Sequence, residues 1–398
     1  EQIYAILLSI VEDDGSYRTL TPVEVAGNTG MADLGNTFAA GRRYAAQVIA
    51  HSDADILETM GLTDSRPSQA VIYDGSGTPE VPDDHDDTWV AITSAQQWID
   101  LANVEDMPSD PADSSSDSQQ KVEWSRKYYL ANDLDFSQLS AAYQTKTKSI
   151  GNTNNRFNGV LDGNGYVIRG LTLSNYDSGL FWYVGASGYI YDLKVENANV
   201  LFSDNAAVLV HNNYGLMEQC AVVNTNITAD TGAVLGGMVS RNYGTIRDSY
   251  VEGGTLTSNS ATSTGHAGFV GANEEGGLIE RCWTSMSVST QSDYAGGFVG
   301  LGYGGTIRNC FALGNVSARS YSGGFVGRSV FQGNAYESCY AAGIVTVTGA
   351  EGNGFIGGNK PNSSFQYDQS EGVFNCYYSS ENTGTHDYGA ERRTPIQM

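Results

Sequence analysis

The feature that most constrains this 398-residue chain is a repeat, clearest at Ala295–Arg319, which reads AGGFVGLGYGGTIRNCFALGNVSAR. His266–Thr290 and Ser322–Thr348 are close copies, and weaker copies surround them. Aligning the copies places one residue of each at a common position: Leu193, Cys220, Ser249, Cys282, Cys310, Cys339 and Cys376. These positions are separated by 27, 29, 33, 28, 29 and 37 residues. A period of this size indicates a solenoid.

Each copy contains three short β-rich pieces separated by Gly, Asn or Ser. In the clearest copy these are Gly297–Val299, Thr306–Leu313 and Asn315–Ala318. None has helical periodicity, and strands this short that recur once per turn fit one coil of a parallel β-helix. We therefore predict an all-β, right-handed parallel β-helix of roughly seven to nine coils, about 35–45 Å long at ~4.8 Å per coil.

At these residues the chain resembles a known family. The pattern G-G-F-V-G…G-T-I-x-N-C-Y-A-x-G-x-V-S is similar to the GLUG repeat of bacterial surface proteins, which include adhesins and non-catalytic parts of immunoglobulin A peptidases. Residues 89–398 fit it throughout. Trp89–Asn103, Tyr128–Phe136 and Phe157–Leu173 look like the family's lead-in segments, and the final TPIQM looks like its close. The resemblance implies a fold and a surface location, not a particular ligand.

Residues 1–78 do not follow the repeat. Gln2–Val11 is an apolar run suited to a buried strand, and Tyr17–Val25 is expected to form a second strand. Thr37–Ser52, TFAAGRRYAAQVIAHS, resembles a strand of fimbrillin-like pilus proteins, which are β-sandwiches. We predict a β-sandwich-like segment, short for a complete sandwich; the alternative is an irregular β cap.

An acidic linker is predicted at 79–88, between the N-terminal segment and a solenoid at 89–398. From Asp74 to Gln120 there are 12 acidic residues and no Lys or Arg, which is half of the net charge of −24. The run Asp83–Asp87 indicates an exposed boundary, and Glu105–Gln120 an acidic, Ser-rich loop. Calcium binding is the alternative for the linker, but no EF-hand spacing is present, so no metal site is predicted.

One helix is expected, at Ser94–Asn103. Thr93 and Gln96 have the spacing of a capping box, and Trp98 and Leu101 fall on one face. The open end of a solenoid exposes core and strand edges. We assign this helix and Tyr128–Phe136 to a cap.

Composition excludes several classes of protein. A net charge of −24 argues against nucleic acid and against anionic membrane surfaces. No apolar run approaches the length of a membrane span. The chain starts at Glu1 without Met, so we expect a mature or trimmed piece of an exported protein, on the outer surface of a bacterium or outside it.

The five cysteines indicate a core row. Their number is odd, and neither a C-x-x-C motif nor a Cys–His cluster is present, which disfavours a metal or redox site. Small apolar side chains stacked inside the solenoid are the better interpretation. Neighbours in register on parallel strands point the same way, which is poor geometry for a disulfide. No cofactor is predicted.

Motifs for catalysis are missing. No H-E-x-x-H, G-x-S-x-G or P-loop is present, and none of the five histidines lies in such a motif: His51, His85, His211, His266 and His386. A polysaccharide-processing β-helix enzyme is the alternative, since such hydrolysis needs two carboxylates flanking the sugar bond. The available acids lie at turn or repeat positions rather than in a single-copy pair: Asp162, Asp192, Asp248 and Glu280. We predict that the chain is not an enzyme.

Two rows are predicted along the solenoid. Two residues before the Cys position the chain reads Tyr191, Glu218, Arg247, Glu280, Arg308, Glu337 and Phe374, whose five central members alternate in sign. In register they form a charge ladder with neighbours about 5 Å apart, which fixes register and solubility. One residue after the Cys position it reads Lys194, Ala221, Tyr250, Trp283, Phe311, Tyr340 and Tyr377.

Strand alternation sends this aromatic row outward if Cys and the small residue two positions later face inward. A narrow coil also has little room for a stack of rings. The alternatives are that the parity is reversed or that a loop covers the row. The predicted ligand-binding residues are therefore Tyr250, Trp283, Phe311, Tyr340 and Tyr377.

The sequence thus predicts a non-enzymatic, adhesin-like rod on a bacterial cell surface. Its expected partner is a host or microbial surface glycan or protein, because aromatic side chains suit the apolar faces of sugars or an apolar strip on a protein. A pilus or another cell-surface anchoring partner is also consistent with the N-terminal segment. The alternatives are the polysaccharide-processing enzyme and a structural stalk without a ligand.

Overall fold

The computed structural model divides into two compact units, Glu1–Asp86 and Asp87–Met398, which are described separately. In the first unit it describes the backbone of six strands. It also describes His85 and Asp86 at the end of the first unit, and in the second unit residues 87–394 except 105–118, 145, 175–178, 203–204, 231–233, 260, 262–263, 331–332, 351, 359–371 and 383–388.

The first unit contains one antiparallel sheet with the order β2-β1-β4-β5-β6, and β3 also pairs with β1. Its strands are β1 (Ile3–Val11), β2 (Tyr17–Thr19), β3 (Val23–Ala26), β4 (Arg43–His51), β5 (Val71–Tyr73) and β6 (Pro79–Glu80). The strand expected at Gln2–Val11 is present as β1. The single strand expected at Tyr17–Val25 is instead two strands, β2 and β3, and Thr37–Ser52 contains β4. The described strands form a single layer, so the sandwich and the fimbrillin likeness stay predictions. Pairing of β6 with β5 brings Pro79 into this sheet, whereas Asp83 and Asp84 lie outside the described residues.

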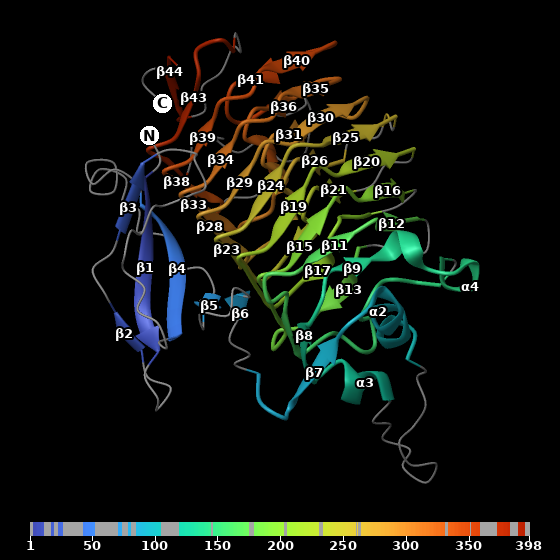
Figure 1. The fold of residues 1–398 in the computed structure, drawn as a ribbon. Helices are drawn as coiled ribbons and strands as arrows, with labels where there is room; N and C mark the ends of the chain where they lie inside the picture. The colour runs from blue at the N-terminus through green and yellow to red at the C-terminus, as the bar shows by residue number, and fades with distance from the viewer. Residues whose placement is uncertain are drawn as a thin grey trace. The chain divides into compact units, whose positions relative to one another are not determined.

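The second unit is the predicted parallel β-helix, built from five parallel sheets that we number I to V in the order in which a coil visits them (Figure 1). Sheet I contains β7 (Trp89–Ile92), β8 (Lys127–Leu130), β10 (Val160–Asp162), β14 (Tyr189–Tyr191), β18 (Leu216–Glu218), β23 (Thr245–Arg247), β28 (Leu278–Glu280), β33 (Thr306–Arg308), β38 (Ala335–Glu337) and β42 (Val373–Phe374). Sheet II contains β9 (Leu134–Asp135), β11 (Val167–Arg169), β15 (Lys194–Glu196), β19 (Ala221–Val223), β24 (Tyr250–Glu252), β29 (Trp283–Thr284), β34 (Phe311–Ala312), β39 (Tyr340–Ala341), β43 (Tyr377–Ser379) and β44 (Glu391–Arg393).

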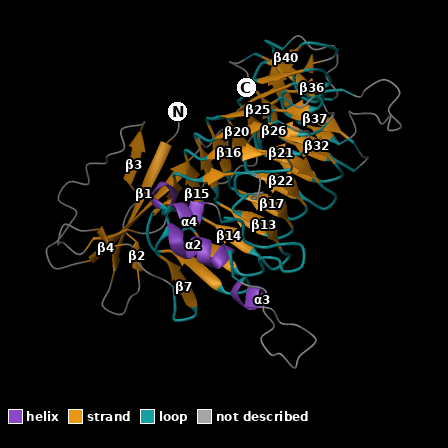
Figure 2. Ribbon diagram, turned by 90° about the vertical axis from the view of Figure 1, so that its right-hand side faces the viewer, coloured by secondary structure: helices purple, strands orange, loops and turns teal. Residues whose placement is uncertain are grey.

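Three smaller sheets complete each coil (Figure 2). Sheet III contains β12 (Thr172–Leu173), β16 (Asn199–Phe202), β20 (Asn226–Ala229), β25 (Thr255–Ser258), β30 (Ser287–Thr290), β35 (Val316–Ala318) and β40 (Val345–Val347). Sheet IV contains β21 (Leu235–Gly236), β26 (His266–Ala267), β31 (Ala295–Gly296), β36 (Ser322–Gly323) and β41 (Gly352–Asn353). Sheet V contains β13 (Phe181–Val184), β17 (Val210–Asn213), β22 (Val239–Asn242), β27 (Val270–Asn273), β32 (Val299–Gly302) and β37 (Val326–Ser329).

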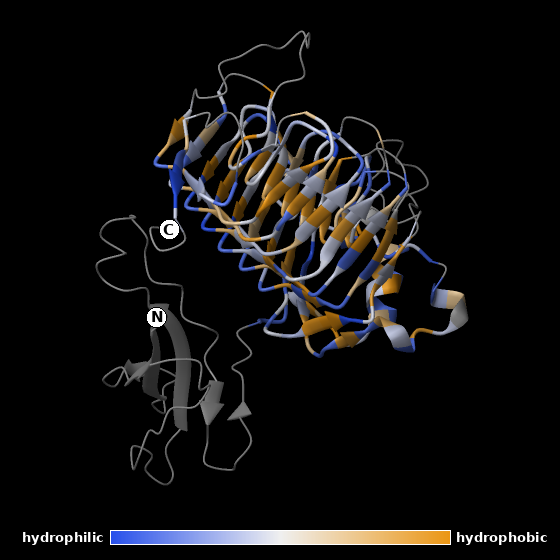
Figure 3. Cartoon of the chain, turned by 90° about the horizontal axis from the view of Figure 1, so that it is seen from above, coloured by the Kyte–Doolittle hydropathy of each residue, from blue (hydrophilic) through white to orange (hydrophobic). Residues whose placement is uncertain are grey.

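Period-two alternation decides which side chains enter the core. In sheet I the middle residue of each three-residue strand is buried, as at Ile246, Ile279 and Ile307, while its two neighbours face outward. Coloured by hydropathy, the solenoid shows apolar strand residues alternating with polar ones along each coil (Figure 3). One contiguous core therefore runs along the solenoid, and every coil buries its apolar residues against its neighbours.

The core contains an internal stack of rings, which contradicts the argument that a narrow coil has no room for one. Phe269, Phe298, Phe325 and Phe355 are fully buried, and successive ring centroids lie 4.7, 4.8 and 4.9 Å apart. The two glycines before Phe298 explain the G-G-F motif. A Cβ on Gly296 would lie 2.0 Å from the Val299 carbonyl oxygen, so only glycine permits the tight bend that brings the ring inside.

A helical cap closes the N-terminal end of the solenoid. Helix α2 (Ala95–Ala102) begins one residue later than the predicted capping box, because Ser94 rather than Thr93 accepts the Gln97 amide. Its Trp98 ring packs edge-on against Phe181, 5.6 Å away. Tyr128–Phe136 was expected to belong to the cap, but it forms strands β8 and β9 of the first coil instead. No helix of the described residues is long and apolar enough to cross a membrane.

Three short helical segments complete the described elements: α3 (Gln119–Glu123), η1 (Phe136–Gln138) and α4 (Ala141–Gln144). The helices α3 and α4 lie near the first coils, with α2 (Figure 2). The rest of the predicted acidic loop, 105–118, lies outside the described residues.

Candidate functional site

The candidate site is the edge where sheet I turns into sheet II. Two residues join the sheets in every coil from β14 to β43. The first of the two has φ between 49 and 54° although it is never glycine: Asp192, Gln219, Asp248, Arg281, Asn309, Ser338 and Asn375. This left-handed bend directs the second residue, the Cys position of the repeat, into the core.

The Cys position is a buried column, as predicted. All five cysteines are buried and free, and consecutive coils place Cys282, Cys310, Cys339 and Cys376 in one row. The Cys282 amide donates to Cys310 Sγ at 3.4 Å. Burial raises the pKa of the Cys220 thiol to about 12 and that of Cys310 well above its ordinary value. Thiols with raised pKa values are inert nucleophiles, so Cys220 and Cys310 serve packing. Against the effect of burial, hydrogen bonds with Cys310 and Cys376 instead lower the pKa of Cys339.

The aromatic row follows directly in sheet II, in the predicted register. Tyr250 pairs with Trp283, Trp283 with Phe311, Phe311 with Tyr340, and Tyr340 with Tyr377. All five side chains are half-buried, whereas the preceding Cys position and the next residue are buried. The row therefore points outward, and the alternative of reversed parity is wrong. We call these five residues the aromatic ladder.

The first four rings of the aromatic ladder, from Tyr250 to Tyr340, lie face to face. Tyr250 and Trp283 are 4.9 Å apart with planes 2° from parallel, Trp283 and Phe311 are 5.7 Å apart at 4°, and Phe311 and Tyr340 are 4.9 Å apart at 3°. At the far end the Arg393 guanidinium lies 5.1 Å from the Tyr377 ring centroid. Burial raises the phenol pKa of both Tyr250 and Tyr340. Trp283 and Phe311 have both ring faces covered, so they present ring edges to solvent.

Exposed apolar residues widen the ladder. Leu313 follows Phe311 by two residues, on the same side of the chain, and is 42% exposed. Phe374, at the end of the charge row, is 59% exposed. The outer surface at this edge therefore combines ring edges with aliphatic and aromatic side chains, the composition expected at a protein-binding surface.

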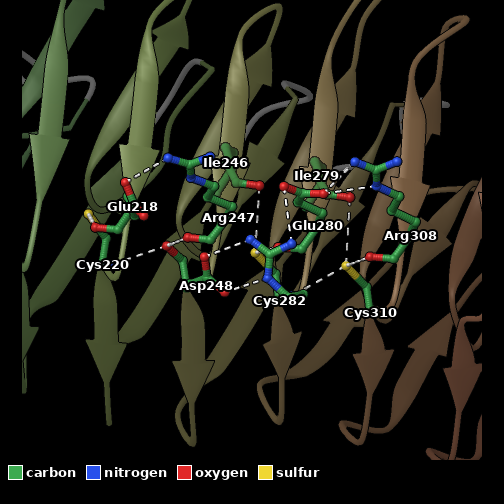
Figure 4. A network of polar contacts seen from close by, with 12 residues as sticks. Glu218, Cys220, Ile246, Arg247, Asp248, Ile279, Glu280, Cys282, Arg308 and Cys310 are labelled. Carbon is green, nitrogen blue, oxygen red and sulfur yellow. Dashed lines mark hydrogen bonds and ion pairs between the residues drawn. The ribbon is translucent and has the colours of Figure 1, made fainter. Parts of the chain in front are cut away.

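The charge row beside the ladder has the predicted register, and Figure 4 shows the pairs that join adjacent strands. Arg247 contacts Glu218 at 3.1 Å, and Arg308 contacts Glu280 at 2.7 Å. The corner residue Arg281 adds a bidentate pair with Asp248, at 2.7 and 2.9 Å, and a 3.2 Å contact with Glu280. Glu218 and Glu280 are buried, so the row is more than a solvated surface ladder.

Each carboxylate considered for catalysis has a structural role instead, in a turn, at a corner or in a pair with arginine. Asp162 is buried and accepts the Asn164 amide at 2.7 Å, which holds a turn. Asp192 is a corner residue, and Asp248 and Glu280 are paired with arginines. Among the described residues no group of three or more His, Cys, Asp or Glu is arranged to hold a metal ion. Of the histidines, His266 is buried against the hydroxyls of Thr264 and Thr290.

A cavity of about 350 Å³ lies elsewhere, beside the cap. It is lined by Phe136, Ser137, Leu139, Gln144, Lys148, Gly170, Thr172 and Ser174. None of these residues is acidic, and the Lys148 ammonium donates to the carbonyl oxygens of Gln144 and Lys146. The lining therefore lacks the paired carboxylates that glycoside hydrolysis requires.

Sequence reasoning missed a second outer stack. Tyr214 and Tyr243 lie 4.4 Å apart with planes 4° from parallel, and the Arg156 guanidinium lies 4.3 Å from the Tyr214 ring centroid. The signal was present as N-Y-G at 213–215 and at 242–244. Asn213 and Asn242 of these triplets start a buried ladder of side-chain amides, in which Asn213 donates to Asn242 and Asn242 to Asn273.

The fold and these ladders define a parallel β-helical repeat protein. Residues 292–317 match the GLUG motif, which confirms the resemblance in the repeat where it is clearest. The structure is similar to that of a "putative immunoglobulin A1 protease" from Bacteroides ovatus, with a TM-score of 0.51 and 18% sequence identity over 76% of this chain and 84% of that one. No curated protein matches the sequence. Motif and fold fit a surface or secreted β-helical protein.

Proposed function

We propose that this chain is a non-catalytic, adhesin-like binding rod of a bacterial surface protein, and that a partner binds along the aromatic ladder. The observation that carries the proposal is the half-buried row of five outward aromatic side chains, which the fold repeats at the same edge of successive coils. A structural stalk needs no aromatic side chain at an outward position. A polysaccharide-hydrolysing enzyme needs a cleft with paired acids, and the cavity beside the cap lacks them.

The stacking geometry favours an apolar strip on a protein over a sugar as the partner of this edge. Sugars bind aromatic residues by placing an apolar ring face on the aromatic face, and here the faces of Trp283 and Phe311 are covered by neighbouring rings. The ring edges, with Leu313 beside Phe311, instead offer an apolar strip. The paired charges of the adjacent row supply a polar rim.

The test changes the strip without breaking the stack. Leu313→Glu places a charge beside the ladder at an exposed position, so the fold is retained and partner binding falls. Val122→Glu is the matched control, because Val122 is 45% exposed on α3, remote in the fold from the ladder. Fluorescently labelled full-length proteins are compared for binding to cultured epithelial cells by flow cytometry.

We expect Leu313→Glu to lower the bound signal at least about tenfold, with Val122→Glu close to the unchanged protein. The double variant Trp283→Ala/Tyr340→Ala should also lose binding, and it should lose stability, at roughly 0.5–1.5 kcal/mol per stacked pair removed. Equal binding of Leu313→Glu and Val122→Glu would remove this edge as the binding surface and favour the stalk.

A further inference from the structure

Sheet III carries two outward rows of small, neutral, polar side chains. The first row contains Asn199, Asn226, Thr255 and Ser287, paired strand to strand. The second contains Leu201 and then a hydroxyl in each of five successive coils: Thr228, Thr257, Ser289, Ser317 and Thr346. We call these five residues the hydroxyl row. No member of either row is charged, although the chain has a net charge of −24.

The hydroxyl row is available for binding. Thr228, Ser289, Ser317 and Thr346 are exposed, and Thr257 is half-buried. Within the described part of the chain, none of the five hydroxyls has a hydrogen-bond partner. The first row is partly used, because Asn226 accepts from the Thr255 amide at 3.2 Å and from its hydroxyl at 3.0 Å. A hydroxyl donates one hydrogen bond and accepts two, so the row offers donors and acceptors at every coil.

The spacing of this grid is set by the fold. Adjacent coils repeat at about 4.8 Å, and the two rows lie roughly 6.6 Å apart because they are two residues apart in each strand. The coil repeat is close to the length that one residue adds to an extended β-linked polysaccharide. A chain lying along the rod therefore meets an equivalent hydroxyl at each successive sugar.

We propose that sheet III is a binding face for an uncharged, extended polysaccharide. Charge decides the class of ligand: the acidic chain repels polyanions, and the uncharged rows offer no ion pair to a charged polymer. The face has no apolar centre of the kind a protein partner buries; Leu201 and Ile344 stand at its two ends. Hydrogen bonds to successive sugars are individually weak, and their number supplies the affinity. This face is distinct from the aromatic ladder of sheet II.

The test uses affinity electrophoresis of the full chain in native gels that contain hydroxyethyl cellulose, xylan or galactomannan, with polygalacturonate as the acidic comparison. The triple variant Thr228→Val/Thr257→Val/Thr346→Val removes three hydroxyls and retains β-branched side chains on the same strands. Thr245→Val/Thr306→Val makes the same exchange on the outer side of sheet I and is the matched control.

We expect retardation by at least one neutral polysaccharide and none by polygalacturonate. The triple variant should bind at least about tenfold more weakly, while the sheet I control and Leu313→Glu bind normally. Failure of every neutral gel to retard the chain, or equal retardation of the triple variant, would overturn the proposal. Slowed ice recrystallisation without polysaccharide binding would assign the face to ice and would overturn it as well. Because Leu313→Glu tests the aromatic ladder alone, the two proposals fail separately.

Discussion

Phe298→Ala and Phe311→Ala form a matched pair that separates the inside of the solenoid from the outside. Both residues belong to the repeat copy Ala295–Arg319 and stack between two neighbouring rings, at 4.7 and 4.8 Å for Phe298 and at 5.7 and 4.9 Å for Phe311. Phe298 is fully buried, whereas Phe311 is half-buried in the outward ladder. The two substitutions therefore remove similar stacking contacts and different amounts of burial.

The expected costs follow from that difference. Phe298→Ala leaves a cavity in the middle of the internal stack, and such substitutions lower the free energy of unfolding by about 3–5 kcal/mol. Phe311→Ala loses roughly half of the 1.5–3 kcal/mol that full burial contributes, together with stacking, for a total of about 1–3 kcal/mol. Solvent fills the space at Phe311, so no internal cavity adds to its cost.

Urea unfolding of the full chain, followed by circular dichroism, measures both variants. Phe298→Ala should lower the urea midpoint of the solenoid transition further than Phe311→Ala. With one common dependence of the unfolding free energy on urea concentration, the difference corresponds to about 2 kcal/mol. Equal shifts, or a larger shift for Phe311→Ala, would show that the assignment of inward and outward rows is wrong. A changed slope would indicate local loss of coils, and hydrogen exchange of the flanking strands would then report which coil opens.

Two further predictions concern the Cys column and the acid side of the pH range. Cys310→Ser should cost at most about 1 kcal/mol, because Ser249 occupies the same position one coil before Cys282 and hydrogen-bonds the Arg247 carbonyl at 2.8 Å and the Cys220 amide at 3.0 Å; a loss above about 3 kcal/mol in the urea midpoint would contradict this. Hydrogen bonds from Lys194 and Arg169 hold the pKa of Glu196 below its ordinary value of 4.5, so its contribution to stability is present above that value and is lost as pH falls through the lower pKa of the folded state. Glu196→Gln should therefore flatten part of the fall in the urea midpoint between pH 5 and pH 3, and an unchanged pH profile would refute the link.

The repeat made the solenoid predictable because its ladders require like residues at like positions. Both outward rows, the charge row and the aromatic ladder, have the predicted register, since one Cys position per copy fixes every other position in the coil. Alternation then gave the outward direction of Trp283 correctly, although the supporting argument about space for rings was wrong. Phe298 shows why: its two preceding glycines let a ring enter the core at a bend, which period-two reasoning does not describe.

The backbone conformation at the corners and the stacking of the rings could not be predicted from residue types alone. Arg281 occupies a left-handed corner, and nothing in its residue type signals a positive φ. Asp248, at the same corner of the preceding coil, is a residue type that adopts this conformation more readily. The near-parallel stacking that covers both faces of the Trp283 ring likewise depends on the exact register of neighbouring strands. The N-terminal segment has no repeat to fix its register, which is why β1 and β4 could be placed from sequence but the pairing of its strands could not.

The two-residue corner between sheets I and II has a consequence for how such rods diversify. That corner has the same length in every coil from β14 to β43, whereas the connection from sheet III to sheet IV takes seven residues after β25, four after β30 and three after β35. One long edge of the solenoid is thus a constant framework, and the opposite connection accepts length changes without displacing any ladder. Duplication of a coil extends the aromatic ladder and the hydroxyl row in register, and an insertion after sheet III adds a loop that leaves both rows intact. The corner between sheets I and II must therefore keep its length in every coil, whereas the connection from sheet III to sheet IV can vary in length and sequence.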